Sequence, residues 1–81
     1  MADAIADRVI GIVTRELGVA PGTIDASTTS ADVEQWDSLG HLQVCMALEA
    51  EFGVSPELET LAELDSVPAI VRYVTDGQTA S

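Results

Sequence analysis

The chain has 81 residues, of which 47% are hydrophobic, and its three aromatic residues are Trp36, Phe52 and Tyr73. This length and an aliphatic composition predict one small domain of packed helices rather than a sheet. Fourteen acidic residues and only three basic ones give a formal net charge of −11, which argues against binding nucleic acid or an anionic membrane surface and predicts basic protein partners.

The sequence contains one cysteine, Cys45, which rules out an internal disulfide and is too few for a zinc site. It shows neither a basic leader followed by an apolar run nor a stretch long enough to cross a bilayer. We therefore expect a single domain over residues 1–81 that is cytoplasmic, monomeric and free of metal.

The first predicted helix covers residues 3–17. Four aliphatic side chains share one arc of its helical wheel, namely Ile5, Val9, Ile12 and Val13. Gly18 follows, where a glycine commonly ends a helix. From residue 19 to residue 36 the periodicity disappears and turn-forming residues predominate, so we predict a long loop that Ile24 and Val33 anchor to the core.

The second predicted helix runs from about Asp37 to Phe52, before Gly53, and it has two apolar faces. One face suits the core and contains Val44, Cys45, Leu48 and Phe52. The other is spaced i, i+3, i+7 and contains Leu39, Leu42 and Met46, with Glu49 at its flank. Either another segment covers this second face, or it is an exposed patch that suits a basic partner with an apolar groove.

Two more helices are predicted after the second. A short one covers residues 57–64 and carries Leu58, Leu61 and Leu64. The last covers residues 67–75, follows the candidate caps Asp65 and Ser66, and ends at Gly77. Its expected buried residues are Val67, Ile70, Val71 and Val74. The predicted fold class is therefore all-α, with three main helices, one short helix and a long first loop.

Asp37 and Ser38 stand where the long loop gives way to the second helix, and three interpretations are open. The simplest is a helix start capped by Asp37. A hydrolase triad of Asp37, Ser38 and His41 is disfavoured, because His41 lies on the same helix without a separate orienting carboxylate, and we expect it to pack or bond locally. The third is covalent modification, since a helix N-terminus favours a phosphate group and a serine there is accessible to another enzyme.

The segment DSLGHLQVCMALEAEFGV, residues 37–54, resembles the signature of the acyl carrier proteins. The flanking ELGV, IDASTTSAD, LETLAEL and DSVPAIVRYV occur in that family's order and approximate spacing. The resemblance implies a four-helix bundle in which Ser38 carries 4′-phosphopantetheine, transferred from coenzyme A by a phosphopantetheinyl transferase, while Asp37 caps the helix. The thiol of this arm would hold acyl groups as thioesters, and the carrier itself would catalyse nothing.

The same resemblance implies a docking surface on the second helix, formed by Leu39, Leu42, Met46 and Glu49. Its expected partners are an acyl- or aminoacyl-loading ligase or transferase, a ketosynthase, and other pathway enzymes with basic docking patches. We also expect the interhelical core to open and shelter an acyl chain, and Cys45 to be a buried small hydrophobe.

Four residues depart from the family's commonest pattern. Gly40 and Gln43 stand where acidic residues often occur, Ala50 removes a further acid, and Trp36 replaces a small or acidic neighbour of the motif. A less acidic second helix favours a specialised or secondary pathway over bulk fatty-acid synthesis, with a fatty acyl or polyketide cargo. Two alternatives stay open: an aminoacyl carrier, although the Gly-Gly typical of peptidyl carriers is missing, and an acidic helical adaptor that never receives an arm.

Overall fold

A computed structural model describes residues 2–79, with side chains from residue 4 to residue 76. The helices are α1 (Ala2–Leu17), α2 (Ser38–Phe52), α3 (Leu58–Glu63) and α4 (Val67–Thr79), and a 3₁₀ helix, η1 (Ser30–Asp32), lies within the long loop. The described residues form no strand, only an isolated bridge between Thr29 and Ser66. The predicted all-α bundle with one short helix is confirmed; residue 1 and residues 80–81 of the expected domain lie outside the described part.

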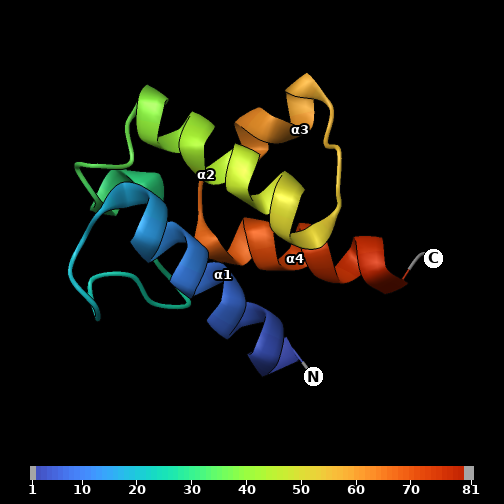
Figure 1. Cartoon of the computed structure of the whole chain (residues 1–81), viewed down its shortest axis with the longest axis horizontal. Coiled ribbons are helices and arrows are strands. Elements are labelled where there is room, and N and C mark those ends of the chain that lie inside the picture. Colours follow the sequence, from blue (N-terminus) through green and yellow to red (C-terminus); the bar gives the residue numbers. More distant parts are fainter. Residues whose placement is uncertain (1, 80–81) are drawn as a thin grey trace.

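The core forms where the aliphatic faces of α1, α2 and α4 meet. α1 packs against both α2 and α4, as Figure 1 shows. The largest completely enclosed side chains are all β-branched: Val9, Val13, Val44, Val67, Ile70 and Val74. Burial of each such side chain contributes about 1.5–3 kcal/mol. Three members of the expected core-facing side of α2 are buried, namely Val44, Cys45 and Leu48, while Phe52 is half-buried.

The long loop is pinned to the core and to the start of α4. Ile24 and Val33 are buried, as predicted, and so are Trp36 and Thr28. The Ser30 N–H donates to the Asp65 carbonyl oxygen at 2.8 Å, and the Val67 N–H donates to the Thr28 carbonyl oxygen at 2.9 Å. These bonds hold the loop beside the end of α3, so the chain enters α2 from a fixed position.

Two of the three predicted glycine stops are confirmed. Gly18 and Gly53 each have φ of 66°, the left-handed conformation in which glycine ends a helix without strain. The prediction that Gly77 ends the last helix is wrong, because α4 continues to Thr79. Glycine permits the left-handed turn without requiring it, and inside a helix it costs only about 1 kcal/mol relative to alanine.

No helix among residues 2–79 combines the length and the apolar character needed to cross a membrane.

Candidate functional site

Asp37 fixes the start of α2. Its backbone is extended, and its Oδ1 accepts a hydrogen bond from the Gly40 N–H at 2.9 Å, which satisfies one of the amides left free in the first turn. Its carbonyl oxygen accepts from the His41 N–H at 2.8 Å. The predicted cap is confirmed, and it makes Ser38 the first residue of the helix.

Gly40 is a close-packed position that the sequence interpretation missed. The residue is buried, and a Cβ there would lie 2.8 Å from Leu17 Cδ2 and overlap the Gln35 carbonyl oxygen. The backbone leading into Asp37 therefore lies directly on the first turn of α2. The signal in the sequence was the glycine itself, a poor helix former placed inside a helix.

Ser38 presents its side chain to solvent, and its hydroxyl has no hydrogen-bond partner among the described residues. The amides of Ser38 and Leu39 precede the first helical hydrogen bond, so the helix leaves them available. Partial positive charge at this end of the helix favours an attached phosphate. The position can accept a phosphate-linked group without displacing an existing contact.

His41 connects the loop, α2 and α3. The Trp36 Nε1–H donates to His41 Nδ1 at 3.0 Å, so Nε2 carries the ring proton and donates to the Leu61 carbonyl oxygen at 2.7 Å. His41 was expected to pack or bond locally, and its contact with Trp36, five residues away, confirms this. Its bond to Leu61, in contrast, joins α2 to α3. Both ring nitrogens are engaged, so neither takes the Ser38 proton, and the triad interpretation fails.

The second apolar face of α2 is exposed. Leu39, Leu42 and Met46 are 65%, 52% and 60% exposed, so neither the loop nor α3 covers them, and Glu49 at their flank is half-buried. Leu58 of α3 is 83% exposed and adds a further apolar side chain to this surface. The sequence predicted Leu58 on the short helix but did not predict its exposure. Single exposed leucines are ordinary, but four exposed apolar side chains, three leucines and one methionine, on α2 and α3 form a patch.

Two hollows meet at Ser38. One, with a volume of about 340 Å³, has a polar lining that includes Ser30, Asp37 and Asp65. The other, about 410 Å³, is a mainly apolar groove between α2 and α3, lined by Leu42, Cys45, Leu58, Leu61 and Ala62 together with Ser38 and His41. Ser38, His41 and Ala62 line both. A third hollow, about 470 Å³, lies between α3 and α4 and does not reach Ser38.

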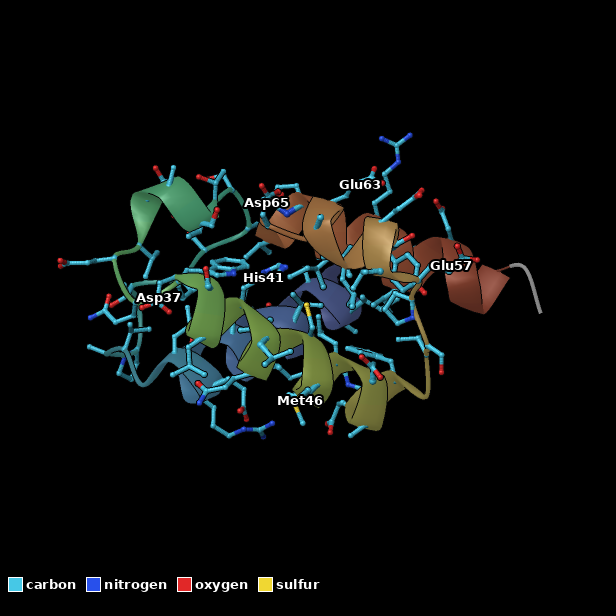
Figure 2. All side chains as sticks on the ribbon, turned by 90° about the horizontal axis from the view of Figure 1, so that it is seen from above. Asp37, His41, Met46, Glu57, Glu63 and Asp65 are labelled. Atoms are coloured by element: carbon cyan, nitrogen blue, oxygen red, sulfur yellow. The ribbon has the colours of Figure 1, made fainter. Side chains whose placement is uncertain are left out.

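Acidic residues surround this site, and no arginine lines either hollow. Figure 2 shows Asp37 at the start of α2, and Glu57, Glu63 and Asp65 along α3 and its ends. Arg8 lies over the Phe52 ring, 4.5 Å from its centroid, at the far end of α2. The site therefore presents an apolar centre with an acidic rim, which complements a basic protein surface.

Cys45 is buried, as predicted. Burial raises the pKa of its thiol, and the nearby Glu49 charge raises it further. Such a thiol is a weak nucleophile at neutral pH. Among the described residues, no group of three or more His, Cys, Asp and Glu side chains is arranged to hold a metal ion.

Comparison with known proteins places this site in a wider context. The family described as "Phosphopantetheine attachment site" matches residues 7–74, which include Asp37 and Ser38. An acyl carrier protein from Zymomonas mobilis subsp. mobilis is 31% identical over 71 residues, which cover 88% of this chain and 91% of that protein.

A solved structure also resembles this chain. The solution structure of holo acyl carrier protein from Geobacter metallireducens matches with a TM-score of 0.79 and 21% sequence identity. The match covers 93% of this chain and 86% of that one. At this identity it shows that the two chains share a fold.

Proposed function

Because the chain belongs to the acyl carrier protein family, whose members are non-catalytic carriers with a covalently attached 4′-phosphopantetheine, we propose that Ser38 is the residue that bears this group. The observation that carries the proposal is the exposed, unbonded Ser38 hydroxyl in the first turn of α2. Asp37 caps this turn through the Gly40 N–H, and the start of the helix leaves the amides of Ser38 and Leu39 available to a phosphate.

The attachment is a phosphoryl transfer that a separate phosphopantetheinyl transferase catalyses with coenzyme A as donor. Ser38 Oγ attacks the phosphorus that bears the pantetheine, and a new P–O bond forms. The pyrophosphate P–O bond breaks, adenosine 3′,5′-bisphosphate leaves, and the serine proton passes to the transferase or solvent. The carrier contributes an accessible hydroxyl and a helix end that favours the phosphate.

The cargo is an acyl group of fatty-acid, polyketide or related biosynthesis, held as a thioester on the thiol that the arm supplies. The groove between α2 and α3 supports this choice, because it begins at Ser38 and its lining is mainly aliphatic. The polar hollow on the other side suits the amide-rich part of the arm, since the Asp37 and Asp65 carboxylates can accept from amide N–H groups.

Partner enzymes dock on the exposed face of α2. Leu39, Leu42 and Met46 form the centre of this surface, and Glu49 lies at its edge. Between Ser38 and Leu48, α2 has no Asp, Glu, Lys or Arg. A partner therefore gains mainly apolar contact over these turns, and its basic groups face the acidic rim around α3. This pattern favours a specialised pathway with its own enzymes.

Intact-protein mass spectrometry tests the attachment. The protein is incubated with coenzyme A, Mg²⁺ and a broad-specificity phosphopantetheinyl transferase, and one phosphopantetheine unit should be gained. Ser38→Ala should gain none, whereas Ser30→Ala, at the serine that shares the polar hollow, should gain one unit. If a folded, unmodified protein stays unmodified with the transferase of its own pathway too, an adaptor without an arm becomes the better interpretation.

Alanine substitutions test the docking surface. Leu42→Ala and Met46→Ala should each lower kcat/KM of a partner enzyme about tenfold, as truncation of a central interface side chain does. Both side chains are more than half exposed, so the unfolding free energy should change little. Thr23→Ala, at an exposed loop residue, should leave kcat/KM unchanged. Equal effects of all three would place the docking surface elsewhere.

A further inference from the structure

The His41 ring makes two hydrogen bonds that cross between segments of the chain. It accepts from the indole N–H of Trp36 at 3.0 Å and donates to the Leu61 carbonyl oxygen at 2.7 Å. The indole is fixed in turn, because Trp36 is buried and its ring stacks on the imidazole with centroids 6.4 Å apart. In Figure 2 His41 lies between α2 and α3. The buried Trp36 of the loop is therefore connected to α3 through the His41 side chain.

Few contacts hold α3 in place before its C-terminal end, where Leu64, the residue directly after the helix, is buried in the core. The helix is six residues long, none of them is buried, and its N-cap residue Glu57 makes no side-chain cap bond. Leu58 faces solvent, and Leu61 is only half-buried. Among the described residues, the bond from His41 is the only hydrogen bond between α2 and α3. Short elements with few buried contacts open at low free energy, so one such bond has a large share in placing α3.

This bond lies where the two hollows beside Ser38 meet. His41 and Ala62 line both the polar hollow and the apolar groove, so the imidazole and the facing side of α3 form the wall between them. Leu58 and Leu61, which line the groove, move with α3 if the bond opens. The width of the groove that begins at Ser38 therefore depends on the contact between His41 and Leu61.

We propose that His41 is a positioning residue: as a clasp between Trp36 and α3, it sets the width of the groove beside Ser38 and so decides which cargo is sheltered there. The proposal rests on the proposed function for the cargo alone, since the clasp exists in the protein without its arm. A short acyl group gains too little burial to open the clasp and stays outside. A longer chain opens it. Each further buried methylene raises the equilibrium constant for the sheltered state about fourfold, whereas loss of the one hydrogen bond lowers it about fivefold.

The clasp is tested first in the unmodified protein. His41→Ala should raise the amide hydrogen-exchange rates of residues 58–64 about fivefold or more, and leave the slowest amides of α1 changed only by the loss of global stability. His41→Gln, whose amide can both accept from Trp36 and donate to Leu61, should restore most of the protection. Trp36→Phe removes only the indole donor and should give an intermediate rate. If exchange in α3 follows global stability in every variant, His41 is a structural residue and the proposal is wrong.

The effect on cargo is tested with acetyl and octanoyl arms transferred to Ser38 from the corresponding coenzyme A derivatives. The octanoyl arm should shift the ¹⁵N resonances of the His41 ring and the Leu61 amide, and the acetyl arm should leave both near their values without cargo. A butyryl arm has an intermediate length. In His41→Ala, its ratio of sheltered to unsheltered population should rise about fivefold relative to the natural protein. Identical His41 resonances in the acetyl and octanoyl forms would overturn the proposal. Failure to load Ser38 at all would instead count against the proposed function, and the exchange measurements would still decide on the clasp.

Discussion

Replacing Gly40 with alanine tests the close approach between the loop and α2. The new Cβ would overlap the Gln35 carbonyl oxygen and lie 2.8 Å from Leu17 Cδ2. Alanine gains about 1 kcal/mol of helix propensity, but overpacking costs about 1–3 kcal/mol, and the upper part of that range applies here because one contact is backbone that cannot rotate away. We expect a net loss of about 1–2 kcal/mol in the unfolding free energy.

Gly11→Ala is the matched control. Gly11 also lies inside a helix, but a Cβ there meets nothing within 4 Å, so alanine should stabilise the protein by about 0.5–1 kcal/mol. Urea unfolding followed by far-ultraviolet circular dichroism measures both variants. With an m-value of about 1 kcal/mol/M for a domain of this size, the midpoints should differ by about 2 M or slightly more, Gly40→Ala being lower.

The result that would refute this reasoning is equal stabilisation by the two alanines. It would mean that the Gln35 carbonyl does not lie on the first turn of α2. A loss of stability at Gly40 should also slow modification of Ser38 by the transferase, because the displaced backbone leads directly into Asp37. Unchanged modification would show that the transferase tolerates a shifted loop.

Three further predictions concern Asp37, Asp25 and Cys45. Asp37→Ala should lower the unfolding free energy by about 0.5–2 kcal/mol, and Asp37→Asn, which still accepts from the Gly40 N–H, should keep most of the stability in urea titrations. Hydrogen bonds from the Ser27 amide, the Ser27 hydroxyl and Thr28 hold the pKa of Asp25 below its ordinary value. Asp25→Asn should therefore be less stable than the natural protein at pH 7. This difference in unfolding free energy should disappear as the pH falls through the lowered pKa of Asp25. Because burial raises the pKa of Cys45, iodoacetamide at pH 8 should alkylate the folded protein at least about tenfold more slowly than the urea-unfolded chain, as mass spectrometry can follow.

Each of these has an outcome that contradicts it. Equal loss in the alanine and asparagine variants of Asp37 would mean that the cap bond does not account for the stability. A stability gap for Asp25→Asn that stays constant from pH 7 to pH 3 would show that the carboxylate charge is not what the loop stabilises. Equal alkylation rates in the folded and unfolded chain would place Cys45 at the surface.

The local features of this fold were predictable because each depends on neighbouring residues. The 3.6-residue periodicity of Val9 and Val13, or of Val44 and Leu48, marks a helix with one apolar side wherever it lies. Asp37 was recognisable as a cap because its side chain bonds an amide only three residues further on. The α4 end was mispredicted at Gly77, since nothing local obliges a glycine to take the left-handed conformation.

The sequence by itself therefore determined four helices, a cap before Ser38 and two apolar faces on α2. Only the tertiary structure decided that Leu39, Leu42 and Met46 stay exposed. It also decided that the Gln35 carbonyl oxygen lies close against Gly40, and that His41 bonds to Leu61. The physical reason is distance along the chain. Periodicity and capping are set within one or two helical turns, whereas exposure, close approach and a bond across 20 residues depend on where separate segments come to rest against one core.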